Sequence, residues 1–228
     1  MYDLMIITML RDYKSILPSI CCLGLILKFS HASIEYDLQP LGNLNKILVN
    51  LEKGKQFGLG QVRGAFGRVQ GKIDFDTKNP SKMKGSVNLD ARTLRFGYHK
   101  VDQDAQQPTW LDTSKFPKIS FQLEGLSKEY WKDNTLFAKA TGTLFLKNTS
   151  APISFPVSVK YLRSKRKKFD GKLGDLLYFQ GTLDLSRGSF GINAGSMLEI
   201  IKDQITVEIS LVGCSNVKRP LLPSRLFM

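Results

Sequence analysis

The sequence predicts an all-β protein, an antiparallel barrel or sandwich of about eight strands. Apolar and polar residues alternate with a period of two along most of the chain, which is typical of strands that bury one face. These segments recur at spacings that antiparallel connections produce, and only one short helix is expected. The alternation argues against a parallel sheet, whose strands are apolar on both faces. The 228 residues, 42% of them hydrophobic, suffice for one domain with a real core.

Eight segments carry the strand pattern, and they are 46–51, 60–76, 85–94, 118–126, 136–148, 151–162, 176–185 and 204–213. In the first, Ile47, Val49 and Leu51 share one face. The second is punctuated by glycines, which mark bends or bulges, and a turn is expected at 77–82. The one short helix is expected between residues 101 and 114, with Trp110 and Leu111 facing the core.

The N-terminal segment, residues 1–32, is predicted to be a signal peptide. Residues 16–29, ILPSICCLGLILKF, form an apolar run after two basic residues, and Ser30-His31-Ala32 places small residues where a signal peptidase cleaves. Cleavage after Ala32 would leave a domain of residues 33–228 in the periplasm or outside the cell, with Cys214 as its single cysteine and no disulfide. A membrane anchor is the weaker alternative, because the run is shorter than the ~20 residues that span a bilayer.

The chain is strongly basic, with a formal net charge of +13, and should attract anionic partners. Part of this charge lies in the segment 161–172, YLRSKRKKFDGK, which could meet an anionic membrane surface or could simply be a solvated hairpin loop. Nucleic acid is not expected, because aromatic side chains for base stacking are not interleaved. The basic residues expected to face a membrane are Arg163, Lys165, Arg166, Lys167 and Lys168.

Catalytic and metal-binding patterns are weak in this sequence. His99 is the one histidine beyond the predicted leader, no G-x-S-x-G motif occurs, and a metal site usually needs several histidine or cysteine ligands. The glycine-rich GLGQVRGAFG lacks the helix that a dinucleotide-binding loop requires. We therefore expect no enzyme, cofactor or metal. An acid–base role for His99 or Asp102 on an apolar substrate is a third, weaker hypothesis.

Large apolar residues are the more informative candidates for a site. An eight-stranded barrel either fills its interior with its own side chains or holds one small ligand, and alternation alone does not separate the two. The strand residues expected to point inward are Phe66, Phe75, Leu89, Phe121, Leu123, Leu144, Leu146, Phe155, Phe179 and Leu183.

Five segments in order resemble the YceI-like family of exported, lipocalin-like proteins. They are GQVRGAFGRVQGKIDFD (60–76), SVNLDARTL (86–94), VDQDAQQPTWLDTSKFPKISF (101–121), ATGTLFLKNTSAPISFPV (140–157) and SRGSFGI (186–192). The resemblance covers residues 45–212. Val101 stands where the family has the arginine of an R-D pair, and LFLKN (144–148) lacks the histidine and glycine of the family's L-T-L-H-G.

The resemblance implies a single antiparallel eight-stranded lipocalin-like barrel around an elongated apolar cavity. Such proteins bind a polyisoprenoid, an isoprenoid quinone or a similar lipid, commonly as a homodimer, and serve as periplasmic carriers or storage proteins. The expected cavity residues then also include Trp110, Leu111, Phe116 and Phe190. The alternative is a non-enzymatic envelope interaction or stress protein with a filled barrel and a basic binding surface.

The segment SRGSFG (186–191) lies where the alternation of the preceding strand ends. We expect Arg187 to be structural, satisfying backbone carbonyls or an acidic partner at the rim of the barrel. Phe190 is expected to plug that end, or else to face the cavity.

Overall fold

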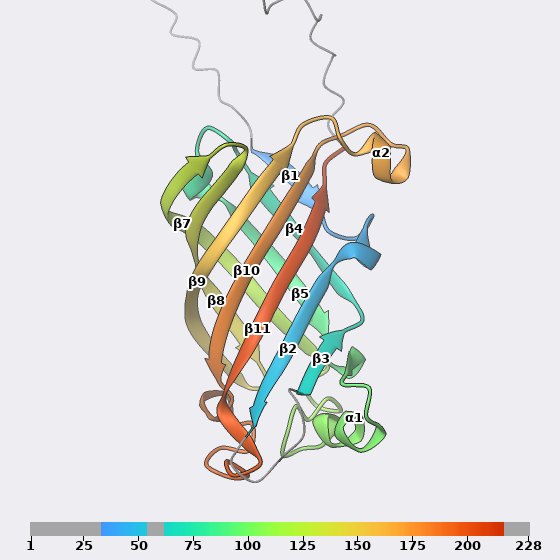
Figure 1. Ribbon diagram of the computed structural model, residues 1–228, viewed down its shortest axis with the longest axis vertical. Coiled ribbons are helices and arrows are strands. Elements are labelled where there is room, and N and C mark those ends of the chain that lie inside the picture. The colour runs from blue at the N-terminus through green and yellow to red at the C-terminus, as the bar shows by residue number, and fades with distance from the viewer. Residues whose placement is uncertain (1–32, 54–61, 217–228) are drawn as a thin grey trace, which may run out of the picture. The chain divides into compact units, whose positions relative to one another are not determined.

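The computed structural model describes residues 33–53 and 62–216, which form a closed antiparallel barrel (Figure 1). The predicted signal peptide lies outside these residues. The chain order of the strands is β1 (Ile34–Asp37), β2 (Lys46–Lys53), β3 (Val62–Phe66), β4 (Val69–Phe75), β5 (Lys84–Asp90), β6 (Leu94–Arg95), β7 (Lys118–Lys132), β8 (Thr135–Leu146), β9 (Thr149–Leu162), β10 (Leu176–Ser186) and β11 (Ile201–Cys214).

Eight of these strands form a ring, which confirms the predicted number. The ring runs β1-β4-β5-β7-β8-β9-β10-β11 and closes where Asp37 of β1 pairs with Cys214 of β11. Strand β2 pairs with the other half of β11 and is followed by β3 and β6. The ring therefore closes through β1 at one end, and β2, β3 and β6 extend the wall at the other (Figure 1).

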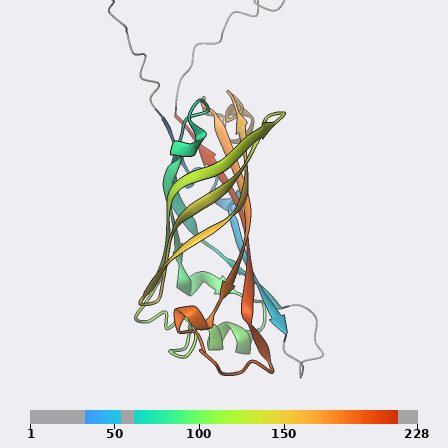
Figure 2. The same cartoon turned by 90° about the vertical axis from the view of Figure 1, so that its left-hand side faces the viewer.

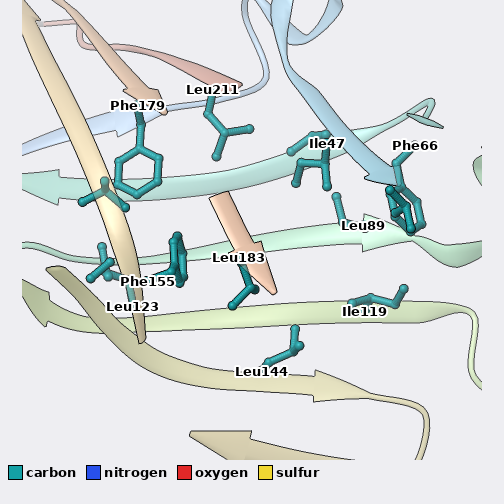
Figure 3. Close-up of a cluster of buried hydrophobic side chains, with 14 of the residues drawn as sticks. Ile47, Phe66, Leu89, Ile119, Leu123, Leu144, Phe155, Phe179, Leu183 and Leu211 are labelled. Atoms are coloured by element: carbon teal, nitrogen blue, oxygen red, sulfur yellow. The ribbon is translucent and has the colours of Figure 1, made fainter. Parts of the chain in front are cut away.

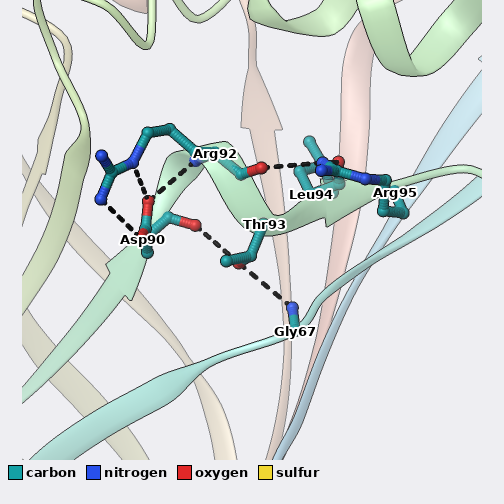
Figure 4. Close-up of polar contacts among 6 residues, drawn as sticks. All are labelled: Gly67, Asp90, Arg92, Thr93, Leu94 and Arg95. Atoms are coloured by element: carbon teal, nitrogen blue, oxygen red, sulfur yellow. Dashed lines mark hydrogen bonds and ion pairs between the residues drawn. The ribbon is translucent and has the colours of Figure 1, made fainter.

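The second predicted strand, 60–76, is divided into β3 and β4 at Gly67. The Thr93 hydroxyl accepts a hydrogen bond from the Gly67 N–H (3.2 Å) and donates one to the Asp90 carbonyl (2.7 Å) (Figure 4). The Arg92 guanidinium bonds the Asp90 carboxylate at 2.8 Å and lowers its pKa. These contacts tie the β3–β4 bend to the end of β5.

The predicted helix is present as α1 (His99–Gln106), and Pro108 follows its end. Trp110 and Leu111 lie in the turns after this helix rather than on it. A second helix, α2 (Lys167–Asp170), lies within the predicted loop between β9 and β10. Short 3₁₀ helices occupy Gly42–Leu44, Pro80–Lys82, Ala91–Thr93 and Gly188–Phe190. Across residues 33–53 and 62–216, no helix is long and apolar enough to cross a membrane.

The two ends of the barrel carry different segments. Helix α1 and the β10–β11 connection lie at one end, and α2 lies at the other (Figures 1 and 2). Toward α2 the interior is filled, because Tyr36, Met83, Leu136 and Val159 are fully buried and pack in one core. None of these four residues lines the open space of the barrel interior.

Candidate ligand-binding cavity

A cavity of about 150 Å³ occupies the barrel interior on the α1 side of this packed core. Ile205 and Leu211 of β11 and Ile119 of β7 are part of its wall. The side chains of facing strands converge on the cavity (Figure 3). No charged side chain from the described part of the chain lines it, and Ser120 is its one polar residue. The site can therefore offer contact with hydrocarbon and almost no hydrogen bonding.

The structure places ten of the fourteen predicted residues in the cavity wall. Their contact with a ligand stays a prediction. These ten are Phe66, Leu89, Leu111, Phe121, Leu123, Leu144, Leu146, Phe155, Phe179 and Leu183.

The other four, Phe75, Trp110, Phe116 and Phe190, do not line the cavity. Phe75 pairs with Ile34 of β1 and is buried in the filled half of the barrel. The Trp110 ring lies against the Arg187 guanidinium, 5.6 Å from ring centroid to Cζ. Phe116 is half-buried in a turn that its N–H closes on the Asp112 carbonyl (2.8 Å). Phe190 is buried in the core at the α1 end, as a plug would be.

Sequence reasoning missed many smaller aliphatic wall residues because it favoured large side chains. The signal was present, since Ile205, Val207, Ile209 and Leu211 alternate along one strand in the same way as the predicted residues. The other missed wall residues are Ile47, Val49, Ile73, Gly85, Val87, Leu94, Ile119, Ser120, Ile153, Leu185 and Ile192.

Two phenylalanines set the width of the cavity. The Phe121 and Phe155 rings are tilted against each other with centroids 5.7 Å apart. A Cβ placed on Gly142 would lie 2.7 Å from the Phe121 ring, and one placed on Gly181 would lie 3.0 Å from the Phe155 ring. These strand glycines let the two rings lie directly on the barrel wall.

The end of the barrel near α1 is held by Arg187. Its side chain is 1% exposed, and its guanidinium donates to five backbone carbonyls in segment 192–202, at 2.7 to 3.1 Å. The prediction that Arg187 satisfies backbone carbonyls is confirmed. One of these carbonyls belongs to Ile192, whose side chain lines the cavity. Arg187 thus fixes the segment that covers the site.

Asp203 supports the same segment and should give it a measurable acid sensitivity. The Ser186 hydroxyl, the Gly188 N–H (2.8 Å) and the Arg187 charge hold the pKa of Asp203 below its usual 3.8. A carboxyl with a lowered folded-state pKa stabilises the fold above its unfolded pKa, and this stability is lost as the pH falls through the folded value. We expect Asp203→Asn to reduce the loss of stability below about pH 4, as measured by urea unfolding at a series of pH values. Parallel curves for variant and wild type would contradict this account.

The basic cluster is only partly on the surface. Arg166 is 1% exposed, which corrects its predicted role at a membrane surface. Its guanidinium pairs with Asp170 (2.8 Å) and donates to the Ser215 carbonyl (2.9 Å), so the side chain points inward. Arg163, Lys165, Lys167 and Lys168 are exposed as expected.

The polar residues weighed for catalysis lie away from the cavity wall. His99 is exposed, and the Asp102 carboxylate accepts a hydrogen bond from the Phe96 N–H next to the start of α1. Within the described ranges, no group of three or more histidine, cysteine, aspartate or glutamate side chains is arranged to hold a metal ion.

A closed antiparallel barrel around an apolar interior is the architecture of lipocalin-like proteins. The model of the YceI-like domain family matches residues 29–213, and the chain belongs to this family. A UPF0312 protein of Pseudomonas paraeruginosa is 27% identical over 138 residues, which are 60% of this chain and 67% of that protein.

Solved structures share the fold. BcnA of Burkholderia cenocepacia superposes with a TM-score of 0.60 at 19% identity, covering 74% of this chain and 95% of BcnA. A domain of Saccharophagus degradans described as polyisoprenoid-binding superposes with a TM-score of 0.56 at 11% identity, covering 80% of this chain and 99% of that domain.

Proposed function

We propose that the protein binds the hydrocarbon chain of a lipid, such as a polyisoprenoid or isoprenoid quinone, and acts as a periplasmic carrier or store of it. The apolar cavity wall is the observation that carries this proposal. Each buried methylene contributes about 0.8 kcal/mol, so a chain can bind well without polar contacts. The polyisoprenoid-binding domain of the same fold supports the ligand class, and the predicted leader supports the location.

The wall also determines which part of the lipid enters. A polar head group in an apolar cavity would lose its hydrogen bonds to water without replacement, which is unfavourable. We infer that the chain lies inside and the head group outside. A dry apolar cavity of this size takes a ligand as large as benzene, so a longer chain requires side chains of the wall to move.

Native mass spectrometry of the protein purified from its own host tests the proposal. We expect a species heavier than the bare chain, and organic extraction should release a long apolar molecule of the corresponding mass. Delipidated protein should then bind an apolar fluorophore such as 1-N-phenylnaphthylamine. A bare mass together with no fluorophore binding would overturn the proposal.

A further inference from the structure

The connection between β9 and β10, residues 163–175, carries an unusual surface, which we call the α2 loop. Phe169 and Leu173 are 55% and 58% exposed, among the most exposed large apolar residues that the structure describes. They lie among five exposed basic residues, which are Arg163, Lys165, Lys167, Lys168 and Lys172. The surface therefore combines apolar side chains with a dense positive charge.

The acidic residues of the α2 loop are turned inward. Asp170 pairs with the buried Arg166, and buried Asp175 accepts hydrogen bonds from the Tyr161 hydroxyl (2.9 Å) and the Ser164 N–H (2.8 Å). Both carboxylates are thus engaged in contacts that hold the loop together, and the charged side chains that face outward are all positive.

The loop is also held in shape. Arg166 donates to Asp170 and, through Nη1, to the Ser215 carbonyl (2.9 Å), which ties the loop to the end of β11. Gly171 ends α2 in the left-handed region (φ 76°), and a Cβ on Gly174 would lie 2.0 Å from the Ser215 carbonyl oxygen. Phe169 and Leu173 are therefore exposed in an ordered loop whose interior is occupied by Arg166.

We propose that the α2 loop docks the protein on an anionic lipid bilayer. Phe169 and Leu173 enter the boundary between head groups and acyl chains, and the five basic residues face acidic head groups. Apolar insertion together with electrostatic attraction is how peripheral segments bind such membranes, and two signals bind better than one. The charge complementarity selects anionic over zwitterionic lipid.

This surface goes beyond the proposed function. It lies at the opposite end of the barrel from α1, and none of its residues lines the cavity (Figure 1). Either proposal can therefore fail while the other holds.

Co-sedimentation of the full chain with vesicles tests the docking. We expect binding to vesicles of phosphatidylcholine and phosphatidylglycerol (7:3) at least ten-fold tighter than to phosphatidylcholine alone. The double variant Phe169→Ser/Leu173→Ser should weaken it at least ten-fold, as should Lys167→Glu/Lys168→Glu. Both variants should unfold in urea at the wild-type midpoint, which shows that they are folded, and fluorophore binding in the cavity should be unchanged.

Control variants carry changes of the same kind elsewhere. Phe145→Ser removes another exposed aromatic ring, 43% exposed on β8, and Lys118→Glu/Lys139→Glu makes the same charge change on the outside of the barrel. Both should bind anionic vesicles within two-fold of wild type. Equal binding to the two kinds of vesicle, or equal loss in the controls, would overturn the proposal. Binding to an acidic polypeptide but not to the anionic vesicles would also overturn it and identify a protein partner instead.

Discussion

Replacing Arg187 with methionine should lower the free energy of unfolding by about 3 to 5 kcal/mol. Five backbone carbonyls would lose their donor, and each buried acceptor left unsatisfied costs about 1 to 3 kcal/mol, with water replacing part of the loss. The segment that carries Ile192 would detach from β11, which opens the covered end of the cavity. Urea unfolding at neutral pH measures the effect.

Two further variants separate the bonding of Arg187 from its charge. Arg187→Lys keeps the charge, but an ammonium has three donors and cannot reproduce the planar fork of five, so it should restore only part of the stability. Arg92→Met removes an arginine whose side chain is 65% exposed and paired with Asp90, and it should cost much less because solvent screens that pair. A stability of Arg187→Met within about 1 kcal/mol of wild type would show that water replaces the guanidinium.

The strands could be predicted because alternation with a period of two requires only local sequence. All eight predicted segments form strands, and Ile47, Val49 and Leu51 share one face of β2, as predicted, and that face is buried. Strand β1 was missed because its four residues, IEYD, are too few to establish a period. Strand β1 nevertheless closes the ring by pairing with β4 and β11. Because both partners are distant in sequence, no local pattern indicates these pairings.

The extent of the cavity could not be predicted, because alternation gives the face of a residue but not its depth along the barrel. Phe75 and Phe179 both point inward, yet Phe75 lies in the filled half and Phe179 lines the cavity.

The burial of Arg166 also could not be predicted from the local sequence. Within KRKK (165–168) nothing distinguishes the buried residue from its exposed neighbours. Its burial depends on the Ser215 carbonyl, 49 residues away in the chain. Arg187 could be interpreted correctly because it directly follows the end of a clear strand pattern, where backbone carbonyls lack strand partners.

The cavity itself is tested by filling it. Leu183 lies in the wall and is 8% exposed, so Leu183→Trp would place an indole in a space of about 150 Å³ (Figure 3). If the indole displaces ligand contacts equivalent to three buried methylene groups, at about 0.8 kcal/mol each, the affinity for an apolar fluorophore falls roughly 50-fold. The free energy of unfolding should change less than the ~1 to 3 kcal/mol typical of overpacking, because the space already exists.

Thr182→Trp is the matched control, because it adds the same side chain one residue earlier on β10, where Thr182 is exposed on the outer face. It should bind the fluorophore as the wild type does. If both tryptophan variants keep wild-type affinity, the fluorophore binds somewhere other than the barrel interior, and the apolar wall is then only a packed core. Loss of binding in Leu183→Trp alone assigns the binding to the space between Phe121, Phe155 and Leu183, since no other feature of β10 differs between the two proteins.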